Sequence, residues 1–137
     1  MFKNVASPLI NGLIITFAHL FKKPVTLQYP TERPVIGPRF RGLHALNRFH
    51  DRSKCVACYL CPTVCPAKCI TVEAAEDPIT HDKYATRYDI DLLRCIFCGY
   101  CVEACPVDAV KMTGTFELAN YRREDFNYTQ EKLTDKQ

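Results

Sequence analysis

Several signals that would assign this 137-residue chain to a common class are missing from it. No apolar run ending in a small-residue cleavage motif opens the sequence, so neither a secretory signal nor a disulfide framework is expected. The motif Cys-x-x-Cys-His does not occur, which excludes c-type haem attachment. No segment offers about 20 predominantly apolar residues, so no transmembrane helix is expected. An Arg-rich and Ser-rich presequence is also missing, and a mitochondrial precursor is therefore not expected.

Acidic residues are nearly absent from the first 50 positions. That part of the chain holds seven Lys or Arg against Glu32 alone, a net charge of +6, whereas positions 51–137 hold eleven against fourteen acids, a net charge of −3. The basic residues of the first part are Lys3, Lys22, Lys23, Arg33, Arg39, Arg41 and Arg48. They are expected to bind anionic lipid head groups or an acidic protein partner. Nucleic acid is not an expected partner, because no nucleic-acid motif accompanies the charge, and a solvated basic face without a partner stays the alternative.

Cysteine, in contrast, is abundant, and eight of the nine cysteines fall in two matching runs. Each run has the form Cys-x-x-Cys-x-x-Cys-x-x-x-Cys-Pro, and the second repeats the first at an offset of 40 residues. In this bacterial ferredoxin spacing, three cysteines hold one 4Fe-4S cluster and the fourth ligates the other cluster. The first predicted ligand set is Cys55, Cys58, Cys61 and Cys105. The second is Cys95, Cys98, Cys101 and Cys65. Because the ligands cross, the two clusters are expected to lie close enough for electrons to pass between them.

Zinc is the main alternative for these cysteines, since closely spaced cysteine pairs also form structural zinc sites. Zinc ribbons, however, use two pairs separated by a longer insert and have no third cysteine at the same step. The ninth cysteine, Cys69, aligns with Ala109 at the 40-residue offset. A free cysteine packs like a small apolar residue, so Cys69 is expected to lie buried near a cluster rather than to act as a ligand.

Residues 54–113 are expected to form a duplicated bacterial-type ferredoxin domain of α+β class. The predicted strands are 70–73, 84–90 and 109–112. A helical turn is predicted after Cys61, where Pro62 suits the first turn of a helix, and its counterpart in the second half is 102–104. About 60 residues provide only a small apolar core, so the ligated clusters are expected to supply part of the folding energy.

An amphipathic helix is predicted near the N-terminus. At 100° per residue, positions 9–23 place most of their apolar side chains on one side. These side chains are Leu9, Ile10, Leu13, Ile14, Phe17, Leu20 and Phe21. Ser7 and Pro8 favour a helix start, and Pro24 prevents continuation. Residues 1–23 are therefore expected to form a membrane-proximal helix, which either lies in the membrane interface or docks into a groove of a membrane partner.

The segments on either side of the cluster domain are expected to make contacts with partners. Residues 24–53 are rich in proline and glycine, which favours an extended docking arm over a helix. Residues 114–137 carry mixed charge and are expected to form a C-terminal docking tail. The histidines near the cysteine runs are expected to be surface or hydrogen-bonding residues, because eight thiolates already complete two clusters. These histidines are His44, His50 and His81.

Further segments, together with the cysteine runs, point to one family. They are Tyr29-Pro30, Arg39-Phe40-Arg41-Gly42-Leu43-His44, Tyr88-Asp89-Ile90-Asp91 and the stretch from Arg94 to Pro106. With these segments the chain resembles the TYKY-type iron–sulfur subunit of complex I, the proton-pumping NADH:quinone oxidoreductase. The likeness extends from about Lys22 to Leu133. The strings Arg-Phe-Arg-Gly and Arg-Cys-Ile-Phe-Cys-Gly are more specific than the cysteine spacing, which fits any ferredoxin with paired clusters.

The resemblance implies an electron-transfer subunit without catalytic residues of its own. Electrons from NADH, passed down a chain of clusters, would cross the two 4Fe-4S clusters of this chain and reach the cluster that reduces quinone. The implied partners are the neighbouring iron–sulfur subunits and the membrane subunit at the quinone site. The implied location is peripheral, on the cytoplasmic side of the bacterial inner membrane.

Three alternatives stay open at the level of the sequence. A soluble ferredoxin would have the cluster domain alone, so the basic N-terminal arm argues against it. A ferredoxin-like subunit of a related membrane-bound hydrogenase would share both clusters and the arm, and its co-purifying partners would distinguish it. A zinc-stabilised binding module would be colourless, whereas a protein with two clusters is brown and carries about eight iron and eight acid-labile sulfide atoms.

Overall fold

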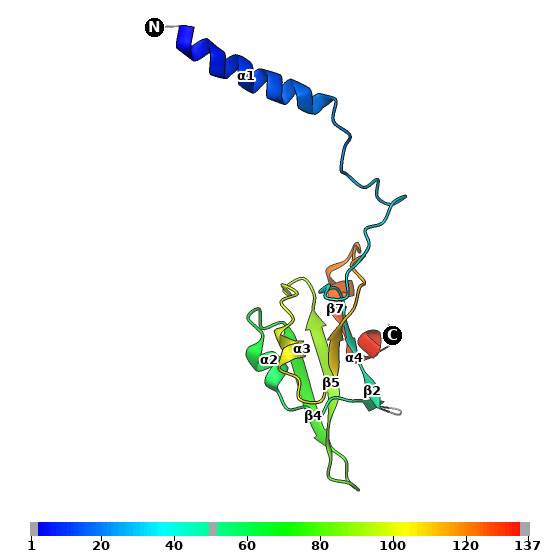
Figure 1. Cartoon of the computed structure of the whole chain (residues 1–137). Helices are drawn as coiled ribbons and strands as arrows, with labels where there is room; N and C mark the ends of the chain where they lie inside the picture. Colours follow the sequence, from blue (N-terminus) through cyan, green and yellow to red (C-terminus); the bar gives the residue numbers. More distant parts are fainter. Residues whose placement is uncertain (1–2, 50–51, 135–137) are drawn as a thin grey trace. The chain divides into compact units, whose positions relative to one another are not determined.

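The computed structural model describes residues 3–49 and 52–134, and the chain divides into two units (Figure 1). One unit spans Met1–Val35 and the other spans Ile36–Gln137. The first unit contains helix α1, Lys3–Leu20, followed by backbone without helix or strand. All of its side chains from residue 7 to residue 35 are exposed, so this described part has no buried core of its own.

Helix α1 confirms the predicted helix but not its start. The sequence favours a start at Ser7 and Pro8, yet the helix begins at Lys3 and includes Pro8. Pro8 is the sixth residue of the helix, where proline cannot donate to the carbonyl four residues earlier and its ring crowds that carbonyl, so the helix continues past Pro8 at a cost. The helix ends at Leu20, before Pro24, as expected. Within the described ranges, no helix combines the length and the apolarity that crossing a lipid bilayer requires.

The second unit is built from antiparallel strand pairs. Its largest sheet has the strand order β4-β5-β7, while β1 pairs with β6 and β2 pairs with β3. The strands are β1 (His44–Leu46), β2 (Arg48–Phe49), β3 (Arg52–Ser53), β4 (Ile70–Glu76), β5 (Lys83–Asp91), β6 (Val110–Met112) and β7 (Asn127–Tyr128). The three strands predicted from the sequence correspond to β4, β5 and β6, of which β4 continues beyond its predicted end to Glu76.

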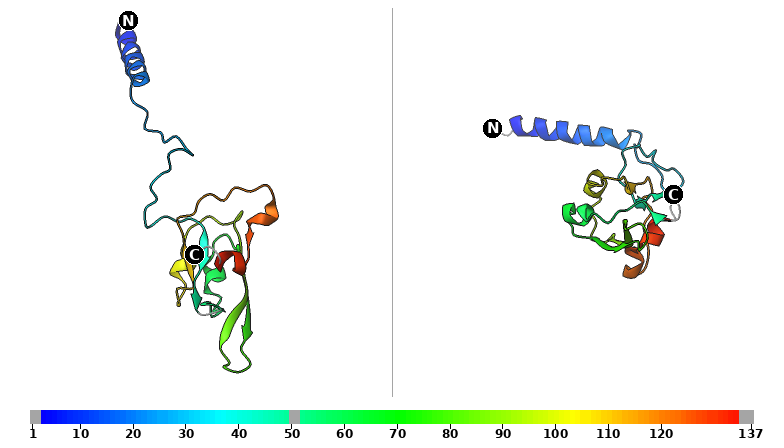
Figure 2. Two further views of the ribbon diagram at one scale, coloured as in Figure 1. Left: turned by 90° about the vertical axis from the view of Figure 1, so that its right-hand side faces the viewer. Right: turned by 90° about the horizontal axis from the view of Figure 1, so that it is seen from below.

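Short helices accompany the strands on two sides. Helices α2 (Leu60–Val64) and α3 (Tyr100–Glu103) begin at the same point of the two cysteine runs, where helical turns are predicted. Figures 1 and 2 show α2 and α3 next to each other on one side of β4 and β5, with α4 (Gln130–Thr134) on the other side. A 3₁₀ turn, η1 (Arg123–Phe126), leads into β7. The mixed α+β class predicted from the sequence is confirmed.

Parts of the expected arm and tail belong to the folded core, which the sequence pattern does not predict. Strand β1 lies within residues 24–53 and pairs with β6, so that Leu46 faces Val110 across the pair. Leu43 and Leu46 are completely buried. The sequence does not predict this strand, because three residues are too few for a periodic pattern and the partner strand lies more than 60 residues away.

The C-terminal segment behaves in the same way up to residue 134. Strand β7 pairs with β5 through Tyr128 and Ile90. Leu133 of α4 is only 1% exposed and belongs to the same apolar cluster as Leu46 and Ile90. The last part of the expected docking tail therefore packs on the cluster domain, where Phe126, Tyr128 and Leu133 join its core.

Candidate metal centre

Two cavities in the second unit are lined by the nine cysteines. The first cavity is lined by Cys55, Cys58, Cys61 and Cys105. The second cavity is lined by Cys65, Cys95, Cys98 and Cys101, and also by Cys69. Apart from Cys69, these groups are the two ligand sets predicted from the sequence, including the exchange of the fourth cysteine between the halves.

The walls of the two cavities are related by the 40-residue repeat. Val56, Val107 and Ala109 line the first cavity, and their counterparts Ile96, Ala67 and Cys69 line the second. The strand pairs follow the same repeat, because Leu46 pairs with Val110 and Ile90 pairs with Ile70. Aliphatic side chains thus line both cavities and lower the polarity around the thiols, which is one means of setting the potential of a bound cluster.

The backbone of the cysteine loops adopts left-handed conformations at matching positions. Within the described chain, the non-glycine residues with positive φ include Ala57 and Phe97, and also Lys68 and Asp108. The φ angles of these residues lie between 47° and 53°. Each pair is separated by 40 residues. Such conformations cost energy for residues with a Cβ, and they turn successive amide groups toward one concave side, where anionic sulfur ligands can be bound.

Several backbone amides of the cysteine loops donate hydrogen bonds to cysteine sulfur. The Ala109 amide donates to Cys105 Sγ at 3.1 Å, and the Phe97 amide donates to Cys95 Sγ at 3.4 Å. Cys65 accepts from more than one amide of its own loop. Burial raises the pKa of Cys65, but hydrogen bonds from the amide and thiol of Cys69 and from the amides of Ala67 and Lys68 outweigh burial and lower it. The site therefore offers donors that favour thiolate over thiol.

The innermost cysteines lack such compensation. Burial raises the pKa of Cys61 to about 11, and the hydroxyl of the neighbouring Tyr88 offsets only part of this effect. Burial likewise raises the pKa of Cys101 to about 12, assisted by repulsion from Cys61. Burial therefore keeps both thiols protonated at neutral pH, and a bound metal centre would have to supply the positive charge that stabilises their thiolates.

Two orphaned polar atoms also fit a bound group. Among the described residues, the buried side-chain atoms without a hydrogen-bond partner of acceptable geometry are His44 Nδ1, Tyr88 Oη and Gln130 Oε1. Tyr88 lines the first cavity and His44 lines the second. A sulfur-rich cluster in each cavity would supply an acceptor for each donor. The residues present therefore fit a 4Fe-4S group in both cavities.

A single metal ion is a poorer match to this arrangement. In residues 3–49 and 52–134, no three His, Cys, Asp or Glu side chains gather in a way that could hold one ion. The four thiols of each set instead line a shared cavity. A cluster with four irons uses one thiolate at each corner, so its ligands surround a volume and do not converge on a point.

The ninth cysteine lies where the repeat predicts a small apolar residue. Cys69 is 5% exposed, and its counterpart Ala109 is also buried. The Sγ atom of Cys69 lies 3.5 Å from Sγ of Cys65. The expectation of burial beside a cluster site is therefore met.

The histidines differ from the sequence expectation at one position. His44 is expected to be a surface or hydrogen-bonding residue, and it is only 2% exposed. The surface alternative is wrong because the burial of β1 could not be foreseen, whereas the hydrogen-bonding alternative stays a prediction. His81 is exposed in the turn between β4 and β5, as expected. His50 lies outside the described residues.

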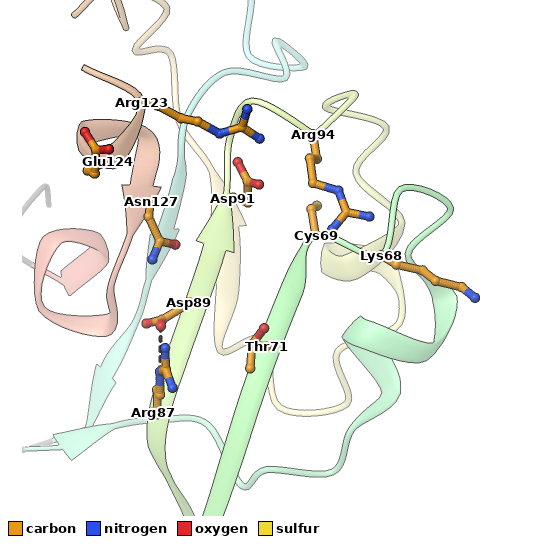
Figure 3. Close-up of a pocket in the computed structure, with 10 residues that line it drawn as sticks. All are labelled: Lys68, Cys69, Thr71, Arg87, Asp89, Asp91, Arg94, Arg123, Glu124 and Asn127. Carbon is orange, nitrogen blue, oxygen red and sulfur yellow. Dashed lines mark hydrogen bonds and ion pairs between the residues drawn. The ribbon is translucent and has the colours of Figure 1, made fainter. Parts of the chain in front are cut away.

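A charged pocket beside the second cavity was not foreseen either. Figure 3 shows it along β4, β5 and β7, with the thiol of Cys69 on its wall. Its cations are Lys68, Arg87, Arg94 and Arg123, and its acids are Asp89, Asp91 and Glu124. Within it, Arg87 Nε donates to Asp89 Oδ2 at 2.6 Å. These residues come from positions 68 to 124, so no local spacing in the sequence could reveal the pocket.

Comparison with known proteins decides the family. A family model described as "4Fe-4S binding domain" matches residues 88–111. NADH-quinone oxidoreductase subunit I 2 of Geobacter metallireducens is 73% identical over 129 residues, which cover 94% of this chain and 98% of that protein. Subunit I 1 of Geobacter sulfurreducens is 75% identical over 129 residues, covering 94% of this chain and 97% of that protein. The chain belongs to the NADH-quinone oxidoreductase subunit I family.

Membership of the subunit I family confirms the resemblance read from the sequence. A member of this family is an iron–sulfur electron-transfer subunit of an oxidoreductase complex, and the other subunits of that complex are its partners. A solved structure described as a membrane-bound sulfane sulfur reductase, an archaeal respiratory membrane complex, contains a chain with 34% identity and a TM-score of 0.57. That match covers 81% of the present chain and 56% of the other.

Proposed function

We propose that this chain holds two 4Fe-4S clusters through crossed ligands and relays electrons from the NADH side of the complex toward the cluster that reduces quinone. Cys55, Cys58, Cys61 and Cys105 would hold the first cluster, and Cys95, Cys98, Cys101 and Cys65 the second. The observation that carries the proposal is the grouping of these eight thiols into two cavities, with one cysteine exchanged between the halves. A bound cluster accepts one electron and passes it on.

The protein's own residues contribute position and environment. Ala57, Phe97, Lys68 and Asp108 give the two cysteine loops matching left-handed turns. Aliphatic side chains line both cavities and backbone amides donate to sulfur, so little rearrangement is needed when the charge of the site changes. No bond is made or broken in the substrate by this chain.

The exchange of ligands between the halves would also place the two proposed clusters close together. Cys61 of the first set and Cys101 of the second are both buried in the same apolar cluster. Helices α2 and α3, which carry these two cysteines, pack against each other. Two clusters held in this way would be separated by little more than those two helical turns, which favours electron transfer between them.

The remaining segments serve attachment in this proposal. Residues 1–23 would form the membrane-proximal helix, because α1 carries exposed apolar side chains such as Leu13 and Phe17. The docking arm would be limited to residues 24–41, since the chain from Gly42 onward is buried in the folded core. The partners would be the neighbouring iron–sulfur subunits and the membrane subunit at the quinone site. This subunit would lie peripherally on the cytoplasmic side of the bacterial inner membrane.

The ligand assignment is tested by single serine substitutions in anaerobically purified protein. Cys65→Ser is expected to damage the second cluster although Cys65 belongs to the first run, and Cys105→Ser is expected to damage the first. EPR spectroscopy together with iron and sulfide analysis identifies the cluster that is lost. Loss of the cluster of the same run in both variants would refute the crossed pairing. The unsubstituted protein should carry about eight iron and eight sulfide atoms.

A subunit of another membrane-bound respiratory complex is the second candidate, favoured by the likeness to the sulfane sulfur reductase structure. The higher identity and near-complete coverage of the Geobacter proteins favour NADH-quinone oxidoreductase. Identifying the proteins that co-purify in mild detergent separates the two, because NADH-oxidising subunits would be recovered only with the proposed complex.

A further inference from the structure

Each cysteine cavity contains one buried polar side chain that the protein leaves without a partner. Tyr88 is 1% exposed and lines the first cavity, while His44 is 2% exposed and lines the second. Among the described residues, neither Tyr88 Oη nor His44 Nδ1 makes a hydrogen bond of acceptable geometry, although the Tyr88 hydroxyl lies close enough to the Cys61 thiol to affect its pKa. Buried polar atoms of native proteins are nearly always paired, so an unpaired one calls for an explanation.

The two residues occupy the same place in the two halves of the domain. His44 pairs with Met112 across β1 and β6, and Tyr88 pairs with Val72 across β5 and β4. Val72 and Met112 are separated by the 40-residue offset of the repeat and are therefore equivalent positions. Their strand partners Tyr88 and His44 are then equivalent as well, and β5 corresponds to β1. The sequence conceals this equivalence, because His44 and Tyr88 are 44 positions apart. Four additional residues separate β1 from the first cysteine run.

Both side chains lie next to a cysteine loop. The His44 ring lies on the ring of Phe97, with centroids 5.7 Å apart and planes inclined at 31°. The amide of Phe97 donates to Cys95 Sγ, so the residue that supports the imidazole also belongs to the second cysteine loop. The Tyr88 hydroxyl lies beside the Cys61 thiol of the first cavity. Both groups can donate a proton in a hydrogen bond, Tyr88 through O–H and neutral His44 through N–H.

We propose that Tyr88 and His44 are equivalent hydrogen-bond donors that set the reduction potentials of the two clusters, Tyr88 acting on the first and His44 on the second. This inference rests on the proposed function, because it requires a cluster in each cavity. A donor to cluster or cysteine sulfur stabilises the more negatively charged reduced state and so raises the reduction potential. Phenol and imidazole at the same position give each cavity a different donor, so the two potentials can be adjusted independently.

The experiment uses the full-length chain loaded anaerobically with iron and sulfide and titrated with reductant while EPR signals are recorded. Tyr88→Phe should shift the first cluster alone to lower potential. His44→Leu should shift the second cluster alone, and His44→Gln, which keeps an N–H donor, should restore most of the original potential. Signals are assigned with Cys58→Ser and Cys98→Ser. Tyr84→Phe on the same strand and His81→Gln in the exposed turn are matched controls expected to change neither potential.

A second measurement keeps the inference testable if His44→Leu fails to load its cluster. Protein labelled with ¹⁵N only in histidine is reduced and studied by pulsed EPR. A ¹⁵N coupling to the second cluster is expected, since among the described histidines only His44 lines a cysteine cavity. The coupling should be absent in His44→Gln.

The outcomes separate the inference from the proposed function. Full loading with about eight iron atoms, unchanged potentials in Tyr88→Phe and His44→Leu, and no ¹⁵N coupling would overturn the roles of Tyr88 and His44 while leaving the two clusters in place. A protein that binds iron at only one cavity, or none, would instead overturn the proposed function.

Discussion

The two units of this chain acquire their structure by different means. In residues 1–35, helix α1 follows from local spacing alone, and its described side chains are all exposed. In residues 36–134, strands far apart in sequence meet, and apolar residues such as Leu46, Tyr88 and Leu133 enclose the cysteines in one core. The first unit therefore presents exposed apolar side chains such as Leu13 and Phe17. The second unit is stabilised by its own apolar core and by the iron–sulfur group that its cysteines bind.

Removal of iron should produce the largest difference in stability between the two units. The buried thiols of Cys61 and Cys101 lose their counter-charge, and the small core cannot hold the loops alone, so the second unit is expected to unfold while α1 keeps its helical content. Amide hydrogen exchange of iron-free and loaded protein measures this unit by unit. Persistent protection of β4 and β5 in the iron-free protein would contradict the expectation.

Truncation of a core side chain should have the next largest effect. Leu133→Ala is expected to destabilise the second unit by about 2–5 kcal/mol, because Leu133 is 1% exposed and the lost side chain leaves a cavity. The matched control Leu13→Ala, at a position 69% exposed, should change stability by less than about 0.5 kcal/mol. Urea unfolding midpoints under anaerobic conditions measure both. Equal effects would mean that α4 is not part of the core.

A glycine substitution in the second unit should have a smaller but definite cost. A Cβ at Gly42 would lie 2.5 Å from the carbonyl oxygens of both Thr113 and Thr115. Backbone atoms cannot move aside cheaply, so Gly42→Ala is expected to cost about 1–3 kcal/mol and to loosen the pairing of β1 with β6. The urea midpoint and exchange rate of the Thr113 amide, which bonds the Leu43 carbonyl, report this change. An unchanged midpoint would show that the contact can relax.

The same substitution in the first unit should have the opposite sign. No atom lies within 4 Å of a Cβ built on Gly12, which sits inside α1. Gly12→Ala is therefore expected to stabilise the helix by about 0.5–1 kcal/mol. Far-UV circular dichroism should show more helix, with the urea midpoint of the second unit unchanged. A loss of helix would indicate that Gly12 has a role that local backbone preference does not explain.

The sequence predicts the cysteine groups well and the supporting strands poorly. Ligand spacing is local, so the two runs point to their loops and to helices α2 and α3 directly. The burial of His44 and Leu46 escapes prediction because β1 has three residues and pairs with a strand more than 60 positions away. The packing of Leu133 escapes for the same reason. Pro8 misleads because proline usually stands in the first turn of a helix, whereas α1 begins five residues before it.

By itself, the sequence determined the helical face of α1, the repeat of the cysteine runs and the family to which the chain belongs. All three depend on residues near one another in the chain, or on identity position by position. Only the tertiary structure decided that Tyr88 and His44 are equivalent, since an insertion shifts them out of the repeat and strand pairing restores them. It alone also decided that the arm and tail complete the core. Burial is a property of contacts between distant segments, and no local pattern encodes it.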